Sequence, residues 1–213
     1  MTDTLWGMAL ALAVFLLAHL APSAVPGLRQ GLRTRLGVMG YRGVFSVVAL
    51  GGLAWIIIAH MHAPYVELWS SPAWARLVPL AAMPLVFILF ACAQKSPGMR
   101  AITRHPMLWG LSLWGLSHIV PNGDAASVMM FGAFALYGLI DMPLADRRIA
   151  SEEPERWATL SAETSAIPFA AIAAGRAQFS LKALGPGRVA GALALYVAVL
   201  FVHEHVIGLS ALP

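Results

Sequence analysis

Long apolar segments alternate with short polar ones along almost the whole chain. Each apolar segment approaches the roughly 20 residues that an α-helix needs to cross the hydrocarbon core of a bilayer. Proline, glycine and asparagine mark the turns between segments, as in Pro121-Asn122-Gly123-Asp124. The pattern predicts an all-α, polytopic helical bundle with about six spans, near residues 5–21, 42–60, 73–93, 105–120, 124–141 and 188–209.

Composition agrees with a membrane location. Hydrophobic residues make up 59% of the 213 positions and charged residues only 11%, whereas soluble domains carry roughly 25% charged residues. We expect one transmembrane domain over residues 1–213, in contact with the lipid bilayer. The single cysteine, Cys92, excludes an intrachain disulfide framework and any cluster or zinc site built from cysteines.

The basic residues predict the orientation. Thirteen of the fourteen Lys and Arg residues fall on one side of the six-span arrangement, and only Arg76 falls on the other. By the positive-inside rule, both termini lie outside the cytoplasm and residues 142–187 form a cytoplasmic segment. The same rule accounts for the net charge of +4, so nucleic acid is not expected as a partner. In this segment, Ser151-Glu152-Glu153-Pro154 predicts one helix start and Thr164-Ser165 a second helix reaching Gln178.

Histidines are the chemically distinctive residues of this chain. An ionisable side chain inside a span costs free energy and points to function. Four of the apolar segments carry six of them: His19, His60, His105, His118, His203 and His205. Two imidazoles from different helices are a common way to hold haem iron. His105 and His118 cannot ligate one iron from a straight helix, because about 20 Å of helix separates them.

The individual histidines differ in their surroundings. His118 follows small residues in Trp114-Gly115-Leu116-Ser117, which favours a ligand role over a hydrogen bond to a neighbouring helix. His19 is either embedded or interfacial. Arg104 and His105 precede Pro106 at a predicted helix start, which is either an anion site or a topology anchor. In His203-Glu204-His205 the two rings point about 200° apart, so they cannot share a site.

Several motifs resemble those of one family of bacterial membrane proteins. These are His19-Leu20-Ala21-Pro22-Ser23, Tyr41-Arg42-Gly43-Val44-Phe45-Ser46, Arg104-His105-Pro106-Met107-Leu108-Trp109-Gly110, Leu116-Ser117-His118 and Asn122-Gly123-Asp124. Together they are similar to the NnrU family over nearly the whole chain. The resemblance implies a multi-pass protein of the bacterial inner (cytoplasmic) membrane, associated with nitrite and nitric oxide metabolism in denitrification.

The resemblance also implies a cofactor. Plant relatives of the family, the zeta-carotene isomerases, are haem b proteins that isomerise a carotenoid double bond. Their ligand histidines match His19 and His118, and His60 and His105 also stand at matching positions. A cysteine of the plant enzymes is replaced here by Gly115. The predicted topology places His19 and His118 at different depths, and His60 with His118 fits the depth better.

Two other functions stay open at this point. The Arg104-His105-Pro106 block is also similar to membrane methyltransferases that use S-adenosylmethionine, with Glu152, Glu153 and Arg156 echoing their acidic–basic segment. A non-catalytic accessory protein of a respiratory complex would use the histidines for helix packing. The first hypothesis is a haem b protein that performs redox chemistry or isomerises a lipophilic small molecule, with Arg104 among the residues around the cofactor. The residues that would catalyse the reaction are unknown.

Overall fold

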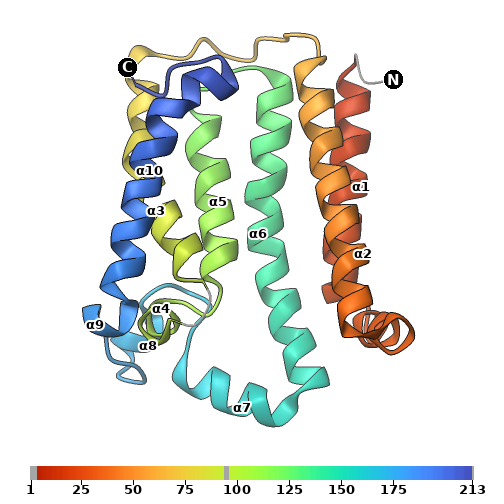
Figure 1. Cartoon of the computed structure of the whole chain (residues 1–213), viewed down its shortest axis with the longest axis vertical. Helices are drawn as coiled ribbons and strands as arrows, with labels where there is room; N and C mark the ends of the chain where they lie inside the picture. Colours follow the sequence, from red (N-terminus) through yellow and green to blue (C-terminus); the bar gives the residue numbers. More distant parts are fainter. Residues whose placement is uncertain (1–3, 94–95, 213) are drawn as a thin grey trace.

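The computed structural model describes residues 4–93 and 96–212, and these residues form a helical bundle (Figure 1). Its long helices are α1 (Leu5–Ala24), α2 (Leu28–Met61), α3 (Leu77–Ala91), α5 (Pro106–Ile119), α6 (Ala125–Glu152) and α10 (Pro186–Ile207). The short ones are η1 (Ala73–Arg76), α4 (Pro97–Ile102), α7 (Pro154–Glu163), α8 (Ala170–Ala173) and α9 (Leu181–Leu184). The all-α fold predicted from the hydropathy pattern is confirmed.

Within the described residues, five helical segments are long and apolar enough to cross a membrane: α1, α2, η1 with α3, α6 and α10. The predicted fourth span corresponds to α5, which has only 14 residues. Although it is shorter than the roughly 17 residues of a minimal span, α5 lies inside the bundle between α3 and α6. The six long helices alternate in direction, so both termini lie at one end, called here the upper end (Figure 1). The count of six spans and the orientation in the membrane stay predictions.

Two helices extend beyond their predicted spans. Gly37 adopts a φ of 69° within α2 and separates a first helical piece from the membrane-length piece that follows. This left-handed conformation suits glycine because glycine has no Cβ. Helix α6 continues past the predicted end at residue 141 to Glu152, and α7 begins at Pro154 rather than at the predicted Ser151.

The helix predicted over residues 166–178 is wrong. Only Ala170–Ala173 is helical there, after Phe169 in a left-handed conformation. The residues before α8 instead bind the α4–α5 linker. The Thr103 hydroxyl and the Trp109 indole both donate to the Ala166 carbonyl, at 3.0 and 2.8 Å. These tertiary hydrogen bonds hold residues 166–169 in bends and turns and override their apolar helical pattern.

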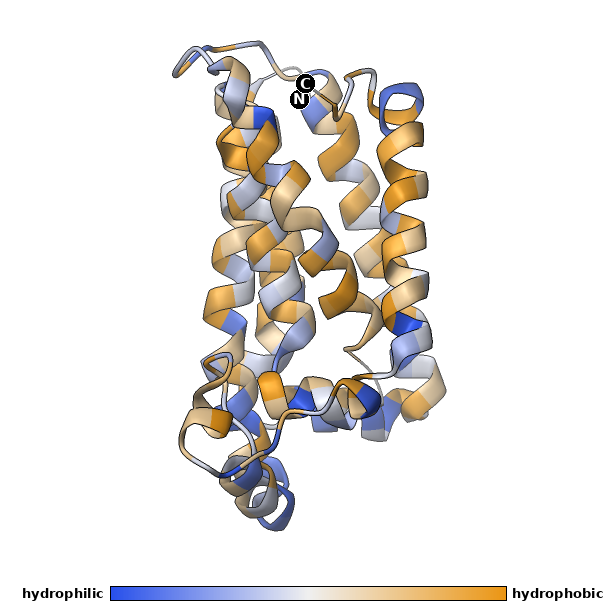
Figure 2. Cartoon of the chain, turned by 90° about the vertical axis from the view of Figure 1, so that its left-hand side faces the viewer, coloured by the Kyte–Doolittle hydropathy of each residue, from blue (hydrophilic) through white to orange (hydrophobic). Residues whose placement is uncertain are grey.

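Small residues allow α5 and α6 to pack closely. A Cβ added to Gly115 would collide with the Phe131 backbone, and one added to Gly138 would collide with Ser112. The Ser112 hydroxyl donates to the Ala135 carbonyl at 3.0 Å, which links the helices in their buried contact. The helix shafts are largely apolar on the outside, and hydrophilic residues gather toward the ends (Figure 2). Helices that contact lipid need such an apolar outer surface along their middle parts.

Candidate functional site

His118 lies in the last turn of α5, at the upper end of the bundle. Its Nδ1–H donates to the Trp114 carbonyl at 2.8 Å, one helical turn earlier. The imidazole also stacks on Phe131 of α6, with ring centroids 5.0 Å apart. Because a carbonyl only accepts, the proton sits on Nδ1 and the Nε2 lone pair of the neutral ring is free to bind a ligand.

The His118 ring lines a cavity of about 140 Å³ between α3, α5 and α10. Most of the wall is apolar and includes Leu80, Met83 and Phe87 of α3 and Val199 of α10. The segment after α10, residues 208–212, forms part of the wall near the upper end. A mainly apolar cavity with a few polar groups is the usual form of a small-molecule site.

A second imidazole and a guanidinium also line this cavity, beside the neutral polar side chains of Asn122, Tyr196 and Ser210. His203 of α10 lines it, and its Nδ1–H donates to the Leu209 carbonyl at 2.8 Å. The Arg76 guanidinium lines it from the end of η1, directly before α3, and donates to the Leu212 carbonyl at 3.4 Å. The predicted topology places His118 and His203 on the same, outer side of the membrane, but the sequence assigns neither His203 nor Arg76 to a site with His118. His205 is exposed, which agrees with the predicted opposite orientation of the two rings.

His19 lies in a different part of the bundle. It is near the lower end of α1, where its Nδ1–H donates to the Phe15 carbonyl at 2.7 Å. Its ring stacks on Phe15 with centroids 3.9 Å apart and meets Phe45 and Tyr137 edge-on. The structure does not bring His19 and His118 into direct contact: along α6, His19 meets Tyr137 and His118 meets Phe131, six residues or about 9 Å of helix apart. Their pairing as ligands stays a prediction that requires a displacement of α1 or α5.

His60 lies at the upper end, in the last turn of α2. Its Nε2 is 3.1 Å from the Ser127 hydroxyl of α6, so that nitrogen already has a partner. His118 contacts Phe131, one turn further along α6. His60 and His118 are therefore at a similar level of the bundle, as the predicted topology requires. His60 does not line the cavity that His118 faces.

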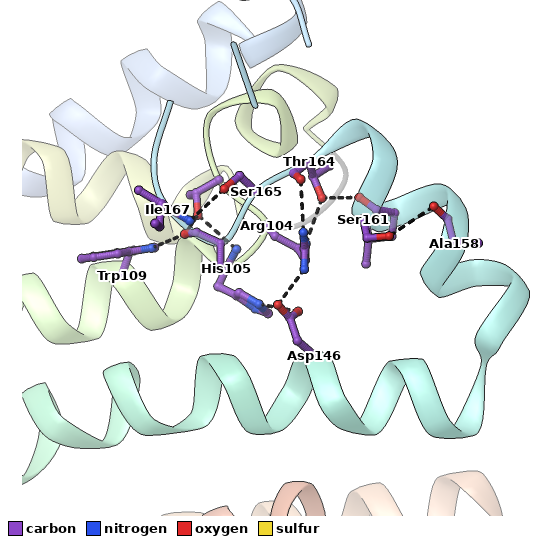
Figure 3. Close-up of polar contacts among 12 residues, drawn as sticks. Arg104, His105, Trp109, Asp146, Ala158, Ser161, Thr164, Ser165 and Ile167 are labelled. Atoms are coloured by element: carbon purple, nitrogen blue, oxygen red, sulfur yellow. Dashed lines mark hydrogen bonds and ion pairs between the residues drawn. The ribbon is translucent and has the colours of Figure 1, made fainter. Parts of the chain in front are cut away.

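Arg104 and His105 lie at the lower end and face Asp146 of α6 (Figure 3). The Arg104 guanidinium donates to Asp146 Oδ2 at 2.6 Å, and His105 Nε2–H donates to Asp146 Oδ1 at 2.9 Å. Arg104 also donates to the Thr164 hydroxyl and carbonyl, at 2.9 and 3.1 Å. Its guanidinium carbon lies 4.6 Å from the ring centroid of Trp157.

We call the cluster of Arg104, His105, Asp146, Thr164 and Trp157 the lower-end latch, because its contacts tie three segments of the chain together. It joins the start of α5 to α6 and to the loop after α7, and internal partners already engage all three guanidinium nitrogens of Arg104. The Arg104 side chain is only 9% exposed. The geometry therefore favours anchoring over capture of a free anion. Sequence analysis had singled out Arg104 and His105 but had missed Asp146, which gives the cluster its charge balance.

Asp141 is a second acid that the sequence interpretation missed. It is 8% exposed and lies on α6 among the membrane-spanning residues. Its Oδ2 accepts a long hydrogen bond of 3.4 Å from the Tyr137 hydroxyl. Its Oδ1 is buried and has no hydrogen-bond partner among the residues that the structure describes. A signal was available, because Asp141 interrupts an otherwise uncharged apolar run.

Comparison with known families decides the membership of the chain. Residues 7–211 match the profile of the NnrU protein family. The chain belongs to the NnrU family. It is also similar to a maize (Zea mays) protein named 15-cis-zeta-carotene isomerase, chloroplastic, with 26% identity over 189 residues.

That alignment covers 79% of this chain and 51% of the maize protein, so the chain spans about half the length of that relative. The Arabidopsis thaliana protein of the same name is 34% identical over 79 residues, which cover 37% of this chain and 22% of that protein. No solved structure gives a significant match. The resemblance inferred from the motifs is thereby confirmed at the level of the family.

Proposed function

We propose that this NnrU-family protein is a multi-pass haem b protein of a bacterial inner membrane that acts on a lipophilic small molecule. The observation that carries the proposal is the free Nε2 of His118, which lines an apolar cavity at the upper end of the bundle. Metal-binding histidines commonly donate their other ring N–H to a carbonyl or carboxylate, which fixes the tautomer. The hydrogen bond from His118 to Trp114 has this form.

The residues around the cavity fit a haem group. His118 offers an imidazole nitrogen, Leu80, Met83 and Phe87 offer apolar contacts, and Arg76 offers a positive charge for a carboxylate. When bound, haem supplies an iron centre that can change oxidation state and coordination. By contrast, Arg104 and His105 form the lower-end latch, so their part in cofactor binding stays a prediction from the resemblance.

The chain itself contributes orientation and exclusion of water. The Trp114 carbonyl and the Phe131 ring hold His118 in one orientation. The apolar side chains of α3 and α10 keep the space beside this imidazole dry. Such a site lowers the dielectric around any bound group and strengthens its polar contacts.

The proposed substrate class is an apolar molecule that reaches the site from the bilayer. The plant relatives are named as isomerases of 15-cis-zeta-carotene, a class of substrate that dissolves in lipid. Isomerisation or redox chemistry on such a molecule is the proposed activity. The association of the family with denitrification makes nitric oxide a second compound to test.

An absorption spectrum of detergent-purified protein, made with a supply of haem, tests the proposal. We expect a Soret band, with α and β bands after reduction by dithionite. His118→Ala is expected to lose most of the bound haem. His62→Ala is the matched control, because His62 is exposed at the end of α2 and should leave the spectrum unchanged.

A protein that stays colourless on titration with haemin would overturn the proposal, as would full haem retention in His118→Ala. If the spectrum is as expected, the reduced protein is then mixed with nitric oxide and, separately, with a cis-carotenoid. A spectral shift with nitric oxide alone would favour the denitrification role. Conversion of the carotenoid, followed by chromatography, would favour isomerisation.

A further inference from the structure

The first piece of α2, residues 28–36, does not run along the bundle. The break at Gly37 turns it, so it is seen nearly end-on at the lower end and lies across the direction of the long helices (Figure 1). In the predicted orientation, this piece lies at the cytoplasmic surface of the bilayer. Helices that lie in the membrane plane at this level contact lipid headgroups and acyl chains at the same time.

The sequence of this piece is amphipathic. Its apolar stripe consists of three leucines spaced about one turn apart: Leu28, Leu32 and Leu36. Arg29 and Arg33 follow one edge of the stripe, and Arg35 lies at the other edge. Arginines in such positions keep their charged heads in water while their aliphatic stems cover apolar surface. The stripe is therefore bordered by positive charge on both sides.

The leucine stripe lines an open apolar groove of about 180 Å³. The other walls are the end of α1 and the part of α2 that follows Gly37, with Ala21, Pro22, Tyr41 and Val44 among their lining residues. Leu36 and Val44 are 45% and 53% exposed, so described parts of the chain leave this apolar surface uncovered. The groove shares no lining residue with the cavity at His118.

The arginines beside the groove have little internal engagement. The side chains of Arg33 and Arg35 make no ion pair or hydrogen bond within residues 4–93 and 96–212, and Arg29 has only an ion pair of 3.8 Å with Glu152. By contrast, Arg176 donates to three carbonyls. A topology signal needs only the charges, whereas here free guanidinium groups border an apolar groove. This combination suits a ligand with an anionic head and an apolar tail.

We propose that the groove binds one anionic phospholipid of the cytoplasmic leaflet. Arg33 and Arg35 flank its phosphate at the mouth of the groove, and one acyl chain lies along the leucine stripe. Charge complementarity argues for this occupant, because anionic headgroups are what a membrane supplies at this level. A neutral apolar molecule, such as the proposed substrate, would leave the arginines unpaired.

Native mass spectrometry of the detergent-purified chain, titrated with dioleoylphosphatidylglycerol, tests the charged part of the site. We expect one such lipid to bind more tightly than dioleoylphosphatidylcholine, which has the same chains and no net charge. Arg33→Gln/Arg35→Gln should weaken its affinity about 25-fold, since each arginine near an anionic lipid contributes about fivefold. The matched control, Arg100→Gln/Lys182→Gln, removes the same charge from exposed positions on α4 and α9 and should leave the affinity unchanged.

Two further variants test the groove at constant charge. Ala21→Leu fills the groove from α1, and Val44→Ser makes its exposed wall on α2 polar. Both should weaken phosphatidylglycerol binding several-fold, because the acyl chain loses apolar contact. Thermal unfolding curves identify any variant that fails to fold, and Val44→Ser at an exposed position keeps the test valid if Ala21→Leu does so.

Three outcomes would overturn the proposal, and none of them depends on haem. Equal affinity for the two lipids, or equal weakening by the two double variants, would mean that general charge attraction explains the binding. Full competition by glycerol 3-phosphate would show recognition of a headgroup without the groove. Displacement of the phospholipid by a cis-carotenoid would assign the groove to the substrate instead.

Discussion

Two aspartates on α6 show how strongly local partners determine what a buried charge does. Asp146 accepts hydrogen bonds from Arg104 and His105, and its charge is balanced by the guanidinium. Asp141, five positions earlier, has only a long contact with Tyr137 and an unpartnered Oδ1. A buried carboxyl without partners costs free energy, whereas a paired one is costly to disrupt.

We therefore expect opposite effects from the same substitution at these positions. Asp146→Asn should lower the free energy of unfolding by about 2 kcal/mol, because hydrogen bonds to charged groups contribute roughly 1.5–3 kcal/mol. Asp141→Asn should leave it unchanged or raise it, because no ion pair is lost. Unfolding by SDS titration in mixed micelles measures both values. Equal destabilisation by the two variants would contradict this interpretation.

The sequence contains part of this residue-level information. Arg104 and His105 stand out because they precede Pro106 at a helix start. Asp146 does not stand out, because its role depends on a contact with residues about 40 positions away. Likewise, His203 and His118 line one cavity only because α10 packs against α3, which hydropathy does not specify.

At the scale of the elements, α5 and α6 pack very closely, and two glycines make this close packing possible. Gly115 and Gly138 allow the two backbones to approach, and each would collide with the neighbouring helix if it carried a Cβ. Small residues at membrane helix interfaces commonly serve this purpose. The contact also positions His118, since Gly115 precedes it by three residues.

Alanine substitutions on α6 test this contact. Gly138→Ala should reduce stability by about 1–3 kcal/mol, as overpacking of a tight interface does. Gly132→Ala is the matched control on the same helix, because its added methyl would meet no atom within 4 Å. The heat-induced loss of the monomer peak in size-exclusion chromatography reports the difference. Equal stability of the two variants would contradict the role assigned to Gly138 in the close packing of α5 and α6.

Most helices were predictable at this scale, and the exceptions have physical causes. The apolar runs identify α1, α2, α3, α6 and α10 because lipid-exposed backbone must satisfy its own hydrogen bonds. The helix expected over 166–178 failed because Thr103 and Trp109 bind the Ala166 carbonyl. Helix α6 runs on past its apolar part to Glu152, beyond the stretch that hydropathy can detect.

At the scale of the whole molecule, the two ends of the bundle are chemically different. The lower end carries the Arg104–Asp146 latch, α7 and most of the basic residues. The upper end carries His118, His203 and Arg76, together with both termini (Figure 1). The predicted orientation places the cavity outside the cytoplasm and the latch within it.

Cysteine labelling tests this orientation in intact cells. Ser71→Cys, in an exposed loop at the upper end, should react with a membrane-impermeant maleimide added from outside. Glu155→Cys, exposed on α7, should react only after the membrane is permeabilised. The native Cys92 is buried and should not react. The reverse pattern would invert the topology and place the cavity on the cytoplasmic side.

The position of α10 along the chain has a consequence for biogenesis. Helices α3 and α5 leave the ribosome well before α10, yet the cavity needs walls from all three. Until α10 inserts, the cavity that His118 lines lacks the wall that α10 provides. Under the proposed role, haem is therefore acquired after the last of these helices has inserted, and a nascent chain arrested before residue 186 would remain free of haem.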